Sequence, residues 1–232
     1  MTPSADHEKS PVLAYALGDA LYLNVTSACT LACVFCPKIR DGHWEVGGYD
    51  LRLEANPRAD EVWAAALAAG RLDRWSEVVF TGLGEPTRRL EVVLDLARRL
   101  KAAGARRVRV DTDGLANLRE GRDVVPALAA AGIDALSVSL NAADPAVYAR
   151  LCPSRFGERA YEAVKDFLRA AVQALPDVSA SAVAVPGLSE EACRAVAQSL
   201  GARFRWRPYD RLGRLDVDGE PSAPPRGEAT ER

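Results

Sequence analysis

The sequence lacks the long apolar runs and the one-sided charge that would assign it to a membrane or a nucleic acid. Hydrophobic residues make up 48% of its 232 residues, but no run approaches the ~18 apolar residues of a membrane-spanning helix. The N-terminal MTPSADHEKSP has no apolar secretion signal. A net charge of −2 argues against a surface dominated by phosphate contacts, although it allows a local arginine patch. We therefore expect a cytoplasmic protein without membrane association.

The chain also lacks the even, dispersed cysteines of a disulfide framework. Of its five cysteines, three are clustered as C-x3-C-x2-C at Cys29, Cys33 and Cys36. In a reducing compartment such a cluster favours metal ligation or catalysis. A closed structural site usually takes four protein ligands, so three thiolates either use a fourth ligand from elsewhere or leave one metal position open.

Runs rich in β-branched residues alternate with helical patterns along the chain. The runs predict strands at residues 21–27, 77–83, 107–114, 135–141, 179–185 and 202–209. Thr87, Asp144 and Ser189 are expected as helix N-caps, and Gly104 and Gly201 as helix ends. Such βα units imply parallel strands, in an open doubly wound sheet or in a full or partial barrel. We expect one α/β domain over 13–210, a flexible arm at 1–12 and a disordered tail at 211–232.

Several motifs follow the predicted strands, at the carboxyl ends where such folds bind ligands. The cysteine motif, with Phe35 before its last cysteine, resembles that of the radical S-adenosylmethionine (SAM) superfamily. TGLGEP at 81–86, DTDG at 111–114, SLN at 139–141 and VPGLSE at 185–190 resemble other motifs of that superfamily. The resemblance spans about residues 13–210 and implies a partial (β/α)6 TIM-like barrel.

Within the superfamily the chain is most similar to the TatD-linked radical SAM group, through stretches such as LGDALYLNVTSACTLACVFCPK and VVFTGLGEPTRRL. That group is named for its association with TatD-type hydrolases, which implies a functional link to one. The sequence departs from the usual motifs at Leu83, inside the Gly-Gly-Glu motif, and at Asp113, where Asn is usual.

The resemblance explains why three cysteines suffice. It implies that Cys29, Cys33 and Cys36 hold three irons of a [4Fe-4S] cluster while SAM chelates the fourth. An electron from a donor such as flavodoxin or ferredoxin then cleaves SAM to a 5'-deoxyadenosyl radical, which abstracts a hydrogen from a small-molecule or macromolecular substrate. The SAM contacts implied are Phe35, Gly82, Gly84, Glu85, Asp111, Ser139 and Asn141.

Other interpretations stay open at this point. A binding module could hold a structural zinc on the three cysteines and His43. Among radical SAM reactions, glycyl-radical-enzyme activases and 7-carboxy-7-deazaguanine synthase-like enzymes are similarly small. Cys152 and Cys193 are isolated, so we expect them to be buried core residues, and no second cysteine cluster indicates an auxiliary iron-sulfur centre.

The last predicted strand alternates arginines with aromatic residues, so one face is cationic and the other apolar. Arg207 lies at the carboxyl end of this strand, where it could bind a carboxylate or phosphate of SAM or of the substrate. Arg203, near the strand start, is expected to be solvated or ion-paired.

Overall fold

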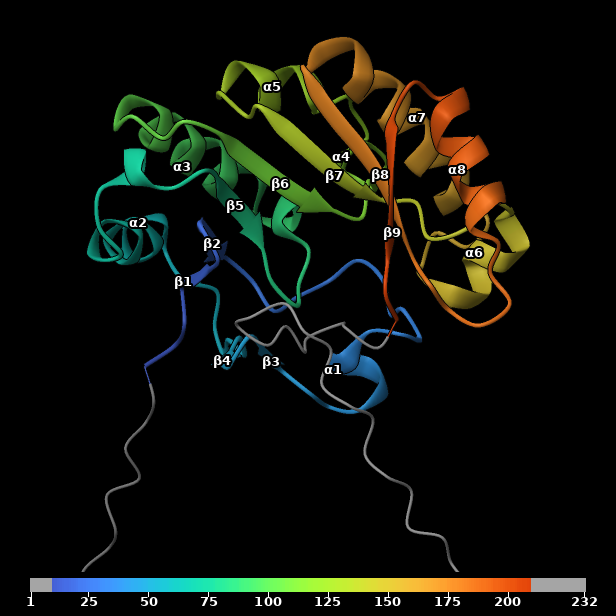
Figure 1. Cartoon of the computed structure of the whole chain (residues 1–232), viewed down its shortest axis with the longest axis horizontal. Coiled ribbons are helices and arrows are strands. Elements are labelled where there is room, and N and C mark those ends of the chain that lie inside the picture. The colour runs from blue at the N-terminus through green and yellow to red at the C-terminus, as the bar shows by residue number, and fades with distance from the viewer. Residues whose placement is uncertain (1–9, 210–232) are drawn as a thin grey trace, which may run out of the picture.

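A computed structural model of the chain describes residues 10–209 (Figure 1). Seven strands form one sheet in the order β1-β2-β5-β6-β7-β8-β9. Their bounds are Ala14–Leu17, Ala20–Asn24, Val78–Thr81, Val108–Thr112, Ala135–Ser139, Asp177–Val183 and Arg203–Arg207. β2 and the five strands after it are mutually parallel. All six predicted strands are thus present, and the curved, mostly parallel sheet confirms the α/β class and is consistent with a partial barrel.

The helices follow the strands and pack on one face of the sheet (Figure 1). They are α2 Ala59–Ala68, α3 Leu90–Ala102, α4 Ala116–Glu120, α5 Val125–Ala130, α6 Pro145–Leu151, α7 Arg159–Ala174 and α8 Glu190–Ser199, with 3-10 turns η1 Leu72–Arg74 and η2 Pro86–Arg89. Leu90, Val93, Leu94, Ala97 and Leu100 of α3 are buried, as their spacing predicts. None of the helices in residues 10–209 is long and apolar enough to span a membrane.

The helix caps are partly as predicted. Asp144 and Ser189 accept hydrogen bonds from the first backbone amides of α6 and α8. The prediction for Thr87 is wrong, because η2 precedes α3 and the Glu85 side chain caps η2 by accepting from the Thr87 amide. Glu85 lies directly before the 3-10 turn and its carboxylate accepts from the amide two residues later, whereas Thr87 lies inside the turn and cannot cap it.

Several elements were not predicted from the sequence. β1 pairs antiparallel with β2 at the sheet edge, α2 follows the cysteine segment, and β3 (Glu45–Val46) pairs with β4 (Tyr49–Asp50) in a small hairpin. The hairpin and the short helix α1 (Pro37–Arg40) lie below the carboxyl ends of the strands in Figure 1. The predicted tail 211–232 and most of the predicted arm, residues 1–9, lie outside the described residues.

Candidate functional site

The three clustered cysteines lie in the segment between β2 and α1. Its backbone is held from two sides: the Ala32 and Val34 amides donate to the Pro153 and Leu151 carbonyls, each at 2.9 Å, and the Glu85 amide donates to the Ala28 carbonyl at 2.9 Å. Anchored in this way, the segment presents Cys29, Cys33 and Cys36 as free thiols that are only half-buried.

All ten site residues named from the sequence line one pocket of about 190 Å³ at the carboxyl ends of the strands. They are Cys29, Cys33, Phe35, Cys36, Gly82, Gly84, Glu85, Asp111, Ser139 and Asn141. The VPGLSE turn does not line this pocket, but Val183, at the end of β8, does. The structure therefore brings together residues that are more than a hundred positions apart, while the role of each one stays a prediction.

Gly84 lies against the backbone of the cysteine segment. A Cβ atom at this position would stand 2.1 Å from the Thr26 carbonyl oxygen and 2.9 Å from that of Ala28. No side chain fits there without moving the segment that carries the cysteines. Gly84 is thus required by packing within the chain, and this requirement holds whether or not its backbone also contacts a ligand.

Glu85 is buried and its carboxylate accepts hydrogen bonds from four groups. Oε1 accepts from the Thr87 amide at 2.9 Å, the Thr87 hydroxyl at 2.6 Å and the Thr112 hydroxyl at 2.8 Å, and Oε2 accepts from the Asp113 amide at 2.6 Å. These donors use the acceptor capacity of an ionised carboxylate. Glu85 consequently ties the loop after β5 to the loop after β6, and both loops line the pocket.

Asp113 is the residue that departs from the usual Asn. Burial and the neighbouring Glu85 carboxylate raise the pKa of Asp113 well above its ordinary value. Its Oδ1 accepts from the Leu115 amide at 2.9 Å, whereas Oδ2 is buried without a partner among residues 10–209. A neutral carboxyl group resembles an amide in shape and can donate from one atom, so Asp113 can replace Asn there.

Asn141 has the backbone conformation that its turn requires, with φ of 57°, a left-handed value that Asn tolerates better than most residues. Its side-chain amide donates to the Cys152 sulfur at 3.3 Å. Cys152 is buried, as predicted, but it is not isolated: hydrogen bonding with Cys152, together with burial, raises the pKa of Cys33. Cys152 does not line the pocket itself.

Cys29 also has an altered pKa. Burial, with smaller contributions from the Asp113 and Glu85 carboxyl groups, raises the pKa of Cys29 to about 12. A thiol in such surroundings is not an activated nucleophile at neutral pH. It becomes a thiolate when a metal centre supplies positive charge, which favours a ligand role over nucleophilic catalysis.

The ligand geometry bears on the zinc alternative. Across residues 10–209, no three side chains of His, Cys, Asp or Glu converge closely enough to hold a single metal ion. Cys29, Cys33, Cys36 and His43 therefore do not form a preassembled zinc site.

Comparison with known proteins identifies the class. The family profile of the Radical SAM superfamily matches residues 23–200, so the chain belongs to that superfamily, whose members are enzymes that use a [4Fe-4S] cluster and SAM. The three cysteine thiols, the loop of Gly82 and Gly84, and the Asp113 oxygen without a partner all lie around the pocket and fit these cofactors.

Individual relatives differ in reaction. The chain is 35% identical over 134 residues to a probable dual-specificity RNA methyltransferase of Opitutus terrae, covering 54% of this chain and 34% of the relative. It is 29% identical over 170 residues to a probable GTP 3',8-cyclase of Thermococcus kodakarensis, covering 73% of this chain and 49% of the relative. The chain thus spans half or less of these relatives.

A solved structure shows the same fold. The radical SAM methyltransferase of Sphaerobacter thermophilus matches with a TM-score of 0.56 at 20% identity, over 84% of this chain and 68% of that one.

Proposed function

We propose that the chain is a radical SAM enzyme that holds its [4Fe-4S] cluster on Cys29, Cys33 and Cys36 and abstracts a hydrogen atom from a small-molecule or macromolecular substrate. The observation that carries this proposal is the single pocket that all ten site residues line at the carboxyl ends of the strands. When bound, the cluster supplies the electron that cleaves SAM to methionine and a 5'-deoxyadenosyl radical.

The residues of the chain divide the remaining work. Gly82 and Gly84 form the loop proposed to bring backbone groups close to the SAM ammonium, while Glu85 holds that loop in place through its four hydrogen bonds. Asp111, Ser139 and Asn141 offer short polar groups to the ribose and carboxylate. Phe35 is buried beside the cysteines, where its ring can pack on the adenine. Together they orient SAM and exclude water from the radical.

The experiment is anaerobic reconstitution of the full chain with iron and sulfide, followed by reduction with dithionite in the presence of SAM. We expect about four irons per chain, from the cluster stoichiometry, and formation of 5'-deoxyadenosine and methionine in equal amounts even without substrate. A Cys29→Ala/Cys33→Ala/Cys36→Ala variant should do neither. Four irons bound to that variant, or one zinc per wild-type chain, would refute the proposal.

The finer assignments belong to the same proposal. We place the enzyme in the TatD-linked group and in the cytoplasm, reduced by a flavodoxin or ferredoxin and functionally linked to a TatD-type hydrolase. Support comes from the motifs shared with that group and from the absence of a spanning helix in residues 10–209. Turnover with reduced flavodoxin in place of dithionite tests the donor, and cell fractionation tests the location.

A further inference from the structure

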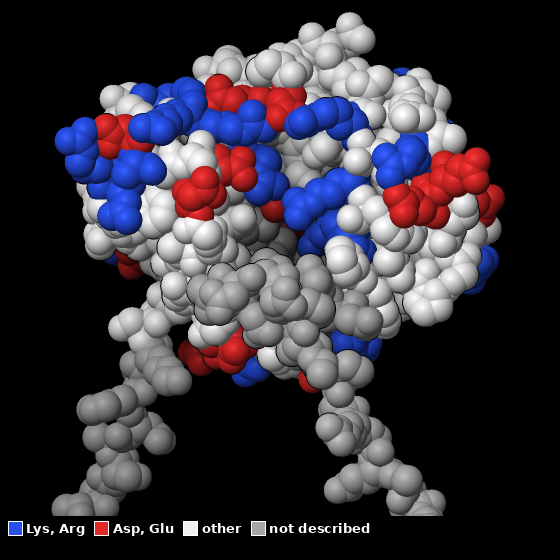
Figure 2. Space-filling model, in the orientation of Figure 1, with Lys and Arg blue, Asp and Glu red and all other residues white. Residues whose placement is uncertain are grey.

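The two faces of the sheet differ in what they present. Leu23, Phe80, Val110 and Val138 point toward the helices and are buried. Within residues 10–209 no helix packs on the opposite face. This face carries polar side chains at matching register, in the rows Asp111–Ser137–Ser179–Arg203 and Ser139–Ser181–Arg205, with Arg207 one step further beside Val183. In Figure 2 a patch of Lys and Arg lies beside the hollow of this face, over β8 and β9.

A second pocket of about 180 Å³ opens on this face next to the cofactor pocket. The two pockets share part of their lining, including Thr81, Gly82, Leu83, Asp111 and Arg207. A molecule held in the second pocket would therefore lie directly against the place proposed for SAM.

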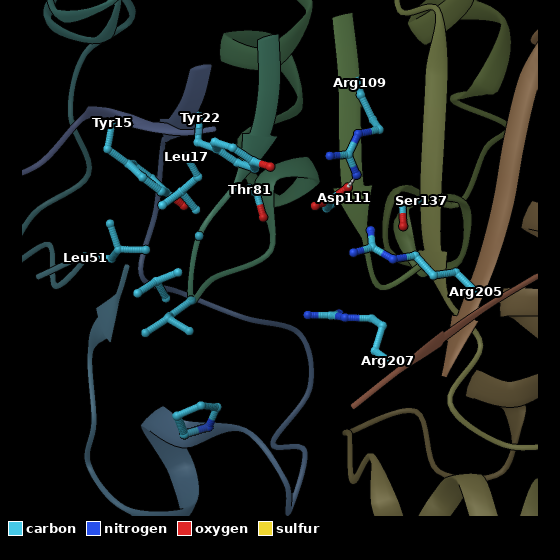
Figure 3. A pocket seen from close by; sticks show the side chains of 14 residues that line it. Tyr15, Leu17, Tyr22, Leu51, Thr81, Arg109, Asp111, Ser137, Arg205 and Arg207 are labelled. Carbon is cyan, nitrogen blue, oxygen red and sulfur yellow. Dashed lines mark hydrogen bonds and ion pairs between the residues drawn. The ribbon is translucent and has the colours of Figure 1, made fainter. Parts of the chain in front are cut away.

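The walls of this second pocket are chemically unlike (Figure 3). Tyr15 and Tyr22 form one wall, with their rings stacked at 5.4 Å between centroids. Arg205 and Arg207 reach toward them from β9 on the other side. An aromatic wall facing a cationic wall suits a molecule with one planar or apolar part and one anionic part.

The charges of the pocket are not balanced. Arg109 is neutralised by Glu77 at 3.0 Å and by Asp111 at 2.5 Å. The side chains of Arg205 and Arg207 form no ion pair or hydrogen bond within residues 10–209. Burial, together with Arg205 and Arg109, lowers the pKa of Arg207 against the opposing effect of Asp111. Arg205 is exposed and Arg207 is half-buried, and neither guanidinium group has a carboxylate at ion-pair distance within the described residues.

Arg203 shows that an anion partner is otherwise supplied on this face. It lies on the same strand with its side chain on the same face, and it pairs with Asp177 at the amino end. The unpaired arginines are thus confined to the end that meets the cofactor pocket.

We infer that the second pocket binds the substrate of the proposed radical SAM reaction through an oxyanion, a carboxylate or a phosphate, held by Arg205 and Arg207, with the rest of the molecule against Tyr15 and Tyr22. This inference rests on the proposed function. Arg205 lines the second pocket but not the cofactor pocket, whereas Arg207 lines both, so Arg205 is the position that tests substrate binding without altering the lining of the SAM site.

The test measures binding of three probes of similar shape to the full chain loaded with cluster and SAM, by ligand-observed NMR under anaerobic conditions. Benzoate and phenyl phosphate carry the two oxyanions, and benzamide is the neutral control. We expect at least one anion to bind at least about tenfold more tightly than benzamide, as loss of a charged hydrogen bond implies. The preferred anion identifies the substrate group.

Two variants complete the test. Arg205→Gln should weaken binding of the preferred anion at least about tenfold, while Arg203→Gln, the matched control, should stay within about twofold because its partner is Asp177. Absence of anion binding at tens of millimolar, equal binding of benzamide, or equal losses in the two variants would overturn the inference.

The same samples separate this inference from the proposed function. Iron content and 5'-deoxyadenosine formation are measured on each of them. A loaded chain that cleaves SAM but binds no anion refutes the oxyanion pocket alone, whereas a wild-type chain without cluster or SAM cleavage refutes the proposed function itself.

Discussion

Arginines lie at both ends of the open face of the sheet, but they form ion pairs at one end and not at the other. At the amino end, Glu77 and Asp177 bind Arg107, Arg109 and Arg203 in a connected set of ion pairs. At the carboxyl end, Arg205 and Arg207 are unpaired within the described residues and Asp113 is buried with one unpartnered oxygen. The arginines are thus ion-paired at the amino end and unpaired at the carboxyl end, where the proposed SAM and substrate pockets lie. Changes at the carboxyl end should therefore affect function, and changes at the amino end mainly stability.

The largest effect is expected at the cysteines. Cys33→Ala should abolish the [4Fe-4S] absorption and all SAM cleavage, because three thiolates are the minimum ligand set. Cys193→Ala is the matched control, since Cys193 is buried in α8 far from the pocket lining. Iron analysis and the visible spectrum check both variants. If Cys33→Ala kept the full cluster, Cys33 would not be one of its ligands, and the assignment of Cys29, Cys33 and Cys36 as the ligand set would be wrong.

A large effect is also expected at Gly84. Gly84→Ala should lower the free energy of unfolding by about 1–3 kcal/mol, the usual result of overpacking, because its Cβ would collide with the Thr26 carbonyl oxygen. Reduced cluster content should accompany the loss, since the displaced backbone carries the cysteines. Denaturant unfolding and iron analysis measure the two effects. Gly104→Ala has no atom within 4 Å of its added Cβ but a φ of 88°, so it measures backbone strain alone and should lower stability without lowering cluster content.

A moderate effect on stability alone is expected at the amino end. Burial opposes the charge of Asp177, but hydrogen bonds from Arg107 and Arg203 outweigh it and lower the pKa of Asp177. Asp177→Asn should cost about 0.5–1 kcal/mol at neutral pH, because both arginines are partly exposed, and should leave SAM cleavage unchanged.

The pH dependence of this cost follows from the same shift. The pKa of Asp177 is lower in the folded chain than in the unfolded chain, whose value is about 3.9. The stabilisation is therefore present above that value and is lost as the pH falls through the folded value. Denaturant unfolding at several pH values should show the wild type and Asp177→Asn converging in strong acid. A constant difference would mean that the ion pairs do not stabilise the chain.

The smallest effect is expected at Asp113. Asp113→Asn should change the free energy of unfolding by no more than about 0.5 kcal/mol and should leave the cluster content unchanged. Burial and the Glu85 carboxylate raise the pKa of Asp113 and so disfavour its charged form, and the amide has nearly the same shape as the neutral carboxyl group. Unfolding and iron analysis on one preparation check this. A marked gain in stability would show instead that Asp113 is charged beside Glu85 in the native chain.

The sequence alone determined the fold class and named residues that the fold brings to one pocket. Six β-branched runs with helices between them admit few topologies, because parallel neighbours require crossovers and place every strand's carboxyl end at one edge. The resemblance of the cysteine motif, and of the motifs after successive strands, to those of the radical SAM superfamily implied ten site residues, all of which line one pocket. Hydrophobic periodicity could not detect β1, which is only four residues long, or the strands β3 and β4, which are two residues long each.

Only the tertiary structure decided how these residues share the work. Glu85 was expected to face SAM, but its four hydrogen bonds come from residues two to twenty-eight positions away, and such partners are not visible in a linear motif. The same holds for Gly84, whose constraint is a carbonyl oxygen fifty-eight residues earlier. The alternation in the last strand predicted a cationic face, but which arginines are paired depends on Asp177 and Glu77 from other strands. An ion pair forms only when two charged groups lie close in space, and residues from different strands come close only once the whole chain has folded.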